Sequence, residues 1–199
     1  MTASRTGART VPGEATRARL LDAAATLFYR EGTSVGIQAL AKAAGVSKRS
    51  MYELFASKDE LLTAALKHRT PSLLDRFLPS PDSPDRPRER ILYVFERLEE
   101  AAAQPGYRGC PFLAVQVELK DVDHPASRAA SAAKDRMRDF FRDEAERAGA
   151  LDPDTLARQL VMLYDGAVAR AGAAGEHLDG LSLTTAATLV DAAVDKRAA

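Results

Sequence analysis

Between residues 47 and 52 the chain carries five side chains that can hydrogen-bond to an anionic partner: Ser47, Lys48, Arg49, Ser50 and Tyr52. Lys and Arg reach phosphate oxygens or the acceptor atoms of guanine, and Ser and Tyr hydroxyls bond to phosphates or base edges. Outside a larger motif, these two cations would most simply form a solvated helix face. Within one, they indicate contact with nucleic acid.

These donors need a helix that turns them outward while its other face packs inward. The inward face is supplied by Met51, Leu54 and Phe55. The ring of Tyr52 is therefore not needed in the core, and its hydroxyl can contact a phosphate. Ser47 stands where an N-cap hydroxyl accepts from the free amides of a first helical turn. The preceding residues 37–44 have one apolar helical face, and the next residue is a glycine, which suits a tight turn because it tolerates positive φ. This order predicts a helix-turn-helix, which places its second helix in a DNA major groove.

One further helix on each side completes an expected N-terminal domain. Apolar residues at helical spacing over 21–28 predict the first of them. Ser57, with Glu60 three residues later, forms a capping box that opens the other, and Pro71 is expected to kink or end it. Lys58 lies in the first turn, where a cation is unfavourable for the helix dipole, so we expect it to contact a phosphate.

Beyond this domain the sequence continues as helices. Four prolines between Pro79 and Pro87 predict a connector. Apolar faces at helical spacing recur after it, with no strand signal and no repeat, so the chain is expected to be all-α with about nine helices. The predicted organisation is a flexible basic arm over 1–13, a helix-turn-helix domain over 14–62 and a second helical domain over 63–199.

The composition excludes several other classes of protein. The first 70 residues carry 11 Lys and Arg against 6 Asp and Glu, and the remainder carry 17 against 22, which favours polyanion binding by the N-terminal part. The single cysteine, Cys110, excludes an internal disulfide and is expected to be a small buried group, with a sensor thiol as the alternative. The three histidines have no second ligand at helical spacing, so no metal or cofactor is expected. Without a signal peptide or membrane-span pattern, the expected location is cytoplasmic.

Residues 17–66 resemble the TetR family of bacterial transcriptional repressors. The resemblance is carried by LLDAAATLF in the first helix and by LAKAAGVSKRSMYELFASKDELL, with its Tyr52, Phe55, Ser57-Lys58 and Leu61-Leu62 tail. It implies a homodimer that binds a palindromic operator in double-stranded DNA. It also implies a small-molecule pocket in the C-terminal helices.

Three positions depart from the family's usual pattern. Leu54 stands where the family often has a histidine. Gly36 stands where the family often has a threonine that caps the helix and contacts phosphate, and it is a weaker cap. Arg49 stands where a small residue is frequent, and its charge either reads a base or strengthens backbone binding. The candidate DNA-binding residues are therefore Gly36, Ser47, Lys48, Arg49, Ser50, Tyr52 and Lys58.

The C-terminal helices suggest two further roles. The last two are rich in Ala, Val and Leu, which suits either an intramolecular core or a two-fold four-helix interface between two copies. A mostly apolar or aromatic effector is expected to meet residues on apolar faces past the connector, although each also suits plain core packing. These candidate ligand-binding residues are Phe95, Phe112, Gln116, Phe140 and Tyr164.

Taken with the resemblance, these features predict a ligand-responsive DNA-binding regulator, a homodimeric repressor released from its operator by a small molecule. The helix from Lys58 to Arg69 is expected to act as the lever between the two domains. The chain is not expected to be an enzyme, since it offers no paired carboxylates, no Ser-His-Asp set and no glycine-rich phosphate loop. The alternative is a helical bundle that binds a small molecule or a protein without binding DNA.

Overall fold

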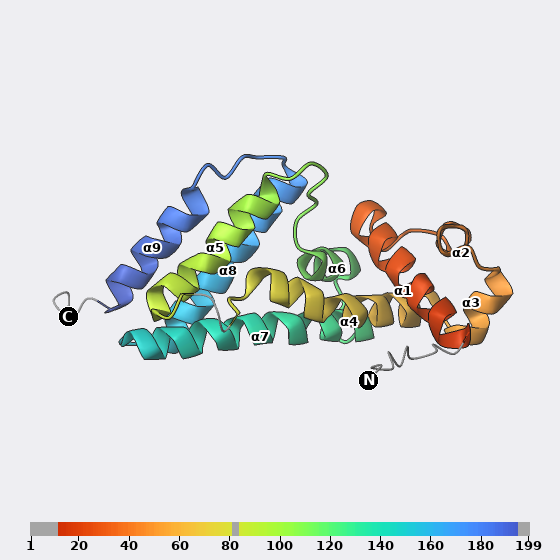
Figure 1. The fold of residues 1–199 in the computed structure, drawn as a ribbon, viewed down its shortest axis with the longest axis horizontal. Coiled ribbons are helices and arrows are strands. Elements are labelled where there is room, and N and C mark those ends of the chain that lie inside the picture. Colours follow the sequence, from red (N-terminus) through yellow and green to blue (C-terminus); the bar gives the residue numbers. More distant parts are fainter. Residues whose placement is uncertain (1–11, 81–83, 195–199) are drawn as a thin grey trace, which may run out of the picture.

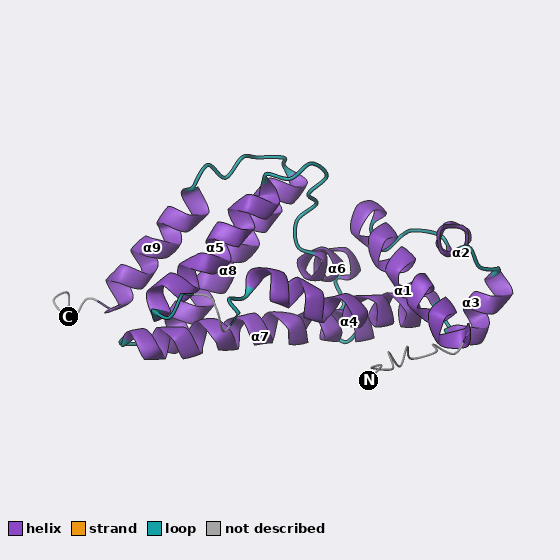
Figure 2. Cartoon of the chain, in the orientation of Figure 1, coloured by secondary structure: helices purple, strands orange, loops and turns teal. Residues whose placement is uncertain are grey.

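The computed structural model of the protein describes residues 12–80 and 84–194. Over these ranges the chain forms nine helices and no strand, which confirms the all-α prediction (Figures 1 and 2). The helices are α1 (Pro12–Glu31), α2 (Ile37–Ala44), α3 (Lys48–Leu54), α4 (Lys58–Phe77), α5 (Pro87–Ala102), α6 (Pro111–Leu119), α7 (Pro125–Ala148), α8 (Pro153–Ala173) and α9 (Leu181–Val194). Residues 1–11 of the expected basic arm lie outside the described residues, and α1 begins just before the predicted domain start at residue 14. None of the helices in the described ranges is long and apolar enough to span a membrane.

The molecule is elongated, and its two ends are built from different helices. Figure 1 shows α1, α2 and α3 at one end and α5, α8 and α9 at the other. Between them α4 and α7 run along the long axis, with α6 near the middle. Because α4 packs against α1 and also against α7, it belongs to both ends of the molecule.

Side-chain caps fix where α3 and α4 begin. The hydroxyls of Ser47 and Ser57 each accept a hydrogen bond of 3.0 Å from the backbone amide three residues on. The Glu60 carboxylate accepts from the amide of Ala56 at 2.7 Å, one residue earlier than the reciprocal bond of a standard capping box. Gly45, with φ of 65°, ends α2 in the left-handed conformation that the predicted turn requires. The local sequence therefore dictates the spacing of the helix-turn-helix.

Helix α4 continues through Pro71 to Phe77, so of the two outcomes expected at that proline, a kink or an end, the end does not occur. The proline ring is exposed, and the Thr70 hydroxyl donates to the Leu66 carbonyl at 2.8 Å in the same turn. Beyond it, Leu74 and Phe77 are 3% and 8% exposed. Burial of these two side chains holds the last turn in place, although a proline inside a helix removes a backbone hydrogen bond.

Two polar contacts hold α9 against α5. The Glu99 carboxylate accepts from the amide of Gly180 at 2.9 Å and from the hydroxyl of Ser182 at 2.7 Å. Toward the other end of α9, Arg88 donates to both carboxylate oxygens of Asp191, at 2.6 and 2.9 Å. These contacts fix one face of α9 inward and leave its other face available.

Candidate nucleic-acid interface and internal cavity

Helix α3 lies at the far end of the molecule with its polar side chains in solvent (Figure 1). Tyr52 is 52% exposed, and Lys48 and Arg49 are exposed beside it. On the opposite face Met51 and Phe55 are 1% and 2% exposed. The helix therefore shows donors outward and buries its apolar groups, as the sequence predicted.

The outward donors differ in whether they already have a partner. The Arg49 guanidinium donates to the Glu53 carboxylate at 2.9 Å, and both side chains are exposed. The hydroxyls of Ser47 and Ser50 lie 2.9 Å apart and share a hydrogen bond. Lys48 has no side-chain hydrogen bond or ion pair within the described ranges. An exposed pair one turn apart contributes only about 0.3–0.5 kcal/mol, so Arg49 can exchange Glu53 for an anionic partner.

Lys58 has a partner that the sequence did not reveal. Its ammonium is half-buried and donates to the carbonyl of Thr33 at 2.9 Å. This bond joins the first turn of α4 to the turn between α1 and α2. The structure thus gives Lys58 a positioning role inside the N-terminal domain, whereas the phosphate contact expected from the helix-dipole argument stays a prediction.

Gly36 caps α2 through its backbone. It has an extended conformation, with φ of −80° and ψ of 151°, and its carbonyl accepts from the amides of Ala39 and Leu40. The residue is exposed, and nothing lies within 4 Å of the place where a Cβ would stand. A larger residue would therefore fit at this position.

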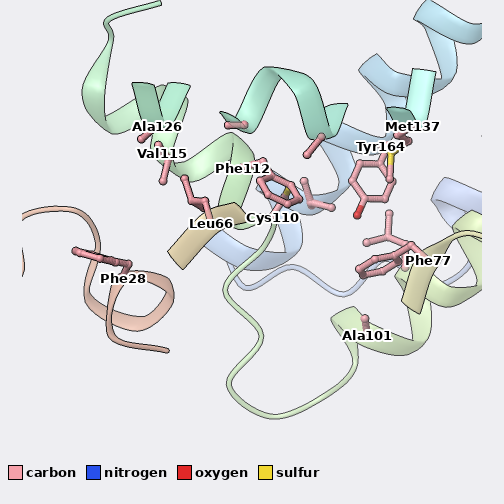
Figure 3. Close-up of a cluster of buried hydrophobic side chains, with 14 of the residues drawn as sticks. Phe28, Leu66, Phe77, Ala101, Cys110, Phe112, Val115, Ala126, Met137 and Tyr164 are labelled. Atoms are coloured by element: carbon pink, nitrogen blue, oxygen red, sulfur yellow. The ribbon is translucent and has the colours of Figure 1, made fainter. Parts of the chain in front are cut away.

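A cavity of about 370 Å³, partly open to solvent, lies where α1, α4, α6, α7, α8 and the loop before α6 meet. Its wall is mainly apolar, and several of its side chains come from the buried cluster in Figure 3. The apolar lining includes Phe28, Leu66, Phe77, Phe112, Val115 and Met137. A void of this size exceeds what close-packed protein interiors normally leave, and it suits a small ligand.

Two of the five predicted ligand-binding residues line this cavity, namely Phe112 and Tyr164. Phe95 lies elsewhere, because its ring stacks on Phe141 with centroids 5.9 Å apart. Phe140 also packs on Phe141, at 5.6 Å.

Gln116 does not line the cavity either. It faces α7 and donates to the Ser131 hydroxyl at 3.0 Å. This glutamine and the rings of Phe95 and Phe140 therefore fill helix contacts, which is the plain core packing that the sequence left open.

Three tyrosines, Tyr29, Tyr107 and Tyr164, are among the polar residues of the cavity wall. Burial raises the pKa of Tyr107, and the nearby Tyr29 and Cys110 raise it further. Burial likewise raises the pKa of Tyr164 well above its ordinary value. Both phenols therefore stay protonated, as neutral hydrogen-bond donors, at neutral pH.

The cavity wall is hydrogen-bonded to the N-terminal domain at two points. The hydroxyl of Tyr29, on α1, accepts from the backbone amide of Arg108 at 2.8 Å. The carboxylate of Glu118, on α6, accepts from the amide of Thr33 at 2.6 Å. Tyr29 and Glu118 both line the cavity, so a ligand there would lie beside both links.

The loop before α6 rests directly on the backbone of α8. A Cβ built on Gly172 would lie 2.2 Å from the backbone nitrogen of Gly109, and one on Gly109 would lie 2.9 Å from the carbonyl oxygen of Val168. The next residue in the loop, Cys110, is 9% exposed and lines the cavity. Its burial agrees with the expected small buried group.

Sequence reasoning missed the cavity residues Tyr29, Tyr107 and Glu118. Tyr107 follows a Pro-Gly pair in a loop, and Glu118 is the one charged residue of α6, so both stood out by type. The hydrogen-bond partner of Tyr29 lies 79 residues away in the sequence, and that of Glu118 lies 85 residues away. Local spacing along the chain does not reveal such pairs.

The geometry of α2 and α3 defines the class of protein, a helix-turn-helix protein whose second helix is free to enter a major groove. Residues 20–65 match the family described as bacterial regulatory proteins, tetR family, and residues 87–179 match the tetracyclin repressor-like C-terminal domain. The chain belongs to the tetR family and is a DNA-binding transcriptional regulator.

Individual relatives support this assignment. A tetR transcriptional regulator from Streptomyces avermitilis is 58% identical, with a TM-score of 0.86, over 89% of this chain and 97% of that one. A TetR-family transcriptional regulator from Streptomyces coelicolor is 30% identical, with a TM-score of 0.77, over 90% of this chain and 94% of that one. HTH-type transcriptional regulators from two Mycobacterium tuberculosis strains are 37% identical over 75 residues, which span 37% of this chain and 37% of their own length.

Proposed function

We propose that the chain is a homodimeric repressor that leaves a palindromic operator when a small molecule occupies the cavity. The observation that supports this most is the cavity of about 370 Å³ beside the links to the DNA-binding end. Most of the cavity lining is apolar, so a ligand that buries this surface gains hydrophobic free energy. A ligand that fills it stabilises whichever arrangement of the helices forms it.

The dimer contact is proposed for the outer faces of α8 and α9, as the sequence predicted. Along α8 the exposed line contains Met162, which is 74% exposed, followed by Gly166 and Ala169. On α9 the exposed line contains Leu181, which is 71% exposed, and Thr188. Small residues between exposed apolar side chains let two helix pairs approach closely across a two-fold axis.

Release from the operator is proposed to act through α4 and the two hydrogen bonds to the cavity wall. Leu66 and Phe77 of α4 line the cavity, and the same helix packs against α1. A ligand that displaces these side chains shifts the DNA-binding end relative to the dimer contact. For release, the effector must bind the displaced arrangement more tightly than the DNA-bound one.

Selection from a random-sequence duplex library tests this function without knowledge of the operator. The expected result is enrichment of an inverted repeat whose half-sites lie one or more helical turns apart, about 34–36 Å or a multiple. A helical bundle that only carries a small molecule would enrich no sequence. Enrichment of a single unpaired half-site would contradict the homodimer.

A further inference from the structure

One part of the cavity wall gathers hydrogen-bond donors. Tyr107, Tyr164 and Arg76 all line the cavity, and the Phe77 ring lies between two of them, with the Arg76 guanidinium 5.8 Å from its centre and the Tyr164 ring centre 6.0 Å from it. Tyr164 is 2% exposed, and Figure 3 shows its hydroxyl on the side where Phe77 lies. In the described ranges neither phenol hydroxyl has a hydrogen-bond partner. The Tyr164 hydroxyl is not among the buried side-chain atoms that lack a partner, so it is accessible from the cavity and can donate to a ligand that brings an acceptor.

We propose that the effector is an amphipathic acid whose carboxylate binds Arg76, Tyr107 and Tyr164 while its apolar body packs against Phe112 and Met137. This inference rests on the proposed role of the cavity as the effector site. A guanidinium and hydroxyl donors are groups that hydrogen-bond strongly to a carboxylate, since the acceptor is charged.

The charges around the cavity favour an anion. Three arginines line it and form no ion pair within the described ranges: Arg30, Arg69 and Arg76. Lys134 also lines the cavity, but it is hydrogen-bonded to Asp165, so these two charges compensate each other. Glu118 is the acid on the lining, and its carboxylate already accepts a backbone amide. All three arginines are exposed and therefore screened by water, so they favour a carboxylate over an amine only modestly.

The aromatic rings of the wall argue against a cationic ligand. Cations bind proteins over the faces of aromatic rings. Here the guanidinium of Arg76 lies 5.8 Å from the Phe77 ring centre, and the ammonium of Lys134 lies 4.7 Å from the Tyr164 ring centre. Two of the rings that could receive a ligand cation are thus already occupied by cations of the protein.

The volume limits the apolar part of the ligand. The cavity, at about 370 Å³, lies at the small end of the range of about 300–1,000 Å³ that ligand sites span. A single aromatic ring on a short chain, or an aliphatic chain of similar volume, fits this space. Arylalkanoic and medium-chain alkanoic acids are therefore the ligand class.

Isothermal titration calorimetry on the full chain without DNA tests the inference with two sets of matched ligands. One set is 4-phenylbutyrate, 4-phenylbutyramide and 4-phenylbutylamine, and the other is octanoate, octanamide and octylamine. Within each set the acid should bind about tenfold more tightly than the amide, and the amine weakest, because only the acid has a charge-assisted bond to Arg76.

Three variants locate the carboxylate. Arg76→Gln should remove the preference for acid over amide, and Tyr164→Phe should reduce the affinity for the acid while leaving the ring packing. Arg136→Gln, at an exposed arginine of α7 outside the cavity, should leave both affinities unchanged. If Arg69→Gln removed the preference for acid over amide and Arg76→Gln did not, the carboxylate would not bind at Arg76, and the assigned position would be wrong.

The order of affinities decides the ligand class. Equal binding of acid and amide, tighter binding of the amine, or no binding of either acid would overturn the inference. Because these titrations contain no DNA, such a failure is separate from failure of the proposed repressor function, which the operator selection measures.

Discussion

At the scale of single residues, Lys48 and Tyr52 are the side chains of α3 most available to DNA. Both are exposed, whereas Arg49 is paired with Glu53 and Lys58 with the Thr33 carbonyl. Phosphate contacts supply much of the affinity of such proteins and make it depend on salt. The largest losses in operator affinity should therefore follow from changes at Lys48 and Tyr52.

Lys48→Ala should weaken operator binding by about 1–3 kcal/mol if the side chain reads a base, or reduce the salt slope by about 1 if it contacts a phosphate. Tyr52→Phe should cost about 1 kcal/mol, since it removes one hydroxyl and keeps the ring. Fluorescence anisotropy with the selected duplex at several salt concentrations measures both. Arg136→Gln, on α7, is the matched control, and unchanged affinity in both α3 variants would refute their role.

The buried phenols of the cavity predict a loss of stability at alkaline pH. Because burial raises the pKa of Tyr164 above its ordinary value near 10, the unfolded chain gives up this proton at lower pH than the folded chain. The contribution of Tyr164 to the free energy of unfolding is therefore complete below about pH 10. It falls as the pH rises above that value, by up to about 1.4 kcal/mol per pH unit. Urea unfolding at pH 9, 10 and 11 should show a smaller loss in Tyr164→Phe than in the native chain. Tyr52→Phe, which removes a hydroxyl outside the cavity, is the control, and equal losses in all three chains would contradict the argument.

The sequence predicted which side chains of α3 are exposed better than it predicted which side chains line the cavity, for a physical reason. The outward face of α3 follows from its own periodicity and caps, all within a few residues of Ser47. Whether Phe95, Phe112 or Phe140 faces a void or a neighbouring helix depends on how α5, α6 and α7 pack, which helical spacing does not contain.

At the scale of elements, the N-terminal domain is tied to the cavity by α4 and by two hydrogen bonds from the region around α6. One runs from Arg108 to Tyr29 and the other from Thr33 to Glu118. The predicted lever, residues 58–69, is extended in the structure to Phe77, and the added turns bring Leu74 and Phe77 to the cavity wall. Pro71 lies between the predicted lever and these added turns, and it is the reason that the sequence placed the end of the helix too early.

Tyr29→Phe and Glu118→Gln should weaken the coupling between ligand and operator. Each removes or reduces one link, so the effector should lower operator affinity by a factor several-fold smaller than in the native chain, within the usual coupling range of about 5–150-fold. Operator affinity measured by anisotropy with and without saturating effector gives this factor. Tyr93→Phe, on α5 outside the cavity, is a matched control, and an unchanged factor in both link variants would exclude these bonds from the route.

At the scale of the whole molecule, the elongated shape seen in Figure 1 separates α3 from α8 and α9, the helices proposed to form the dimer contact. Figure 1 places α3 at one end and α9 at the other, so a two-fold axis through α8 and α9 would hold two copies of α3 well apart. Such spacing is what a duplex with two half-sites requires. In a dimer, binding of one α3 helix to its half-site holds the second α3 helix close to the other half-site. This raises the affinity for a site with two half-sites.

Gly166→Arg should convert the dimer into a monomer, because it places a long charged side chain in the middle of the proposed flat contact. The position is exposed, and nothing lies within 4 Å of an added Cβ, so the variant should fold. Sedimentation velocity should show half the native mass, and operator affinity should fall by a factor of about 100 or more. Ala132→Arg, on an exposed face of α7, is the matched control. A Gly166→Arg protein that stays dimeric would contradict the assigned contact.

The all-helical architecture and its order were predictable, since nearly every boundary carries a glycine, a proline or a capping hydroxyl. Gly45, Ser57 and Gly149 mark such positions, and the structure ends or begins helices at each. The cavity was not predictable in the same way, because it is bounded by side chains from five helices and one loop.

The contact between Gly109 and Gly172 has a consequence for how two copies respond together. The backbone of the loop before α6 contacts the backbone of α8 with no side chain between them. Because no side chain can change its rotamer to accommodate a shift of the loop, the shift moves α8 itself. This helix faces the twin subunit in the proposed pairing. Filling one site should therefore alter its twin, and titration of operator release against effector should give a sigmoidal curve with a Hill coefficient above 1. Gly172→Ala places a methyl group against the loop and separates it from α8. This variant should lower the Hill coefficient toward 1.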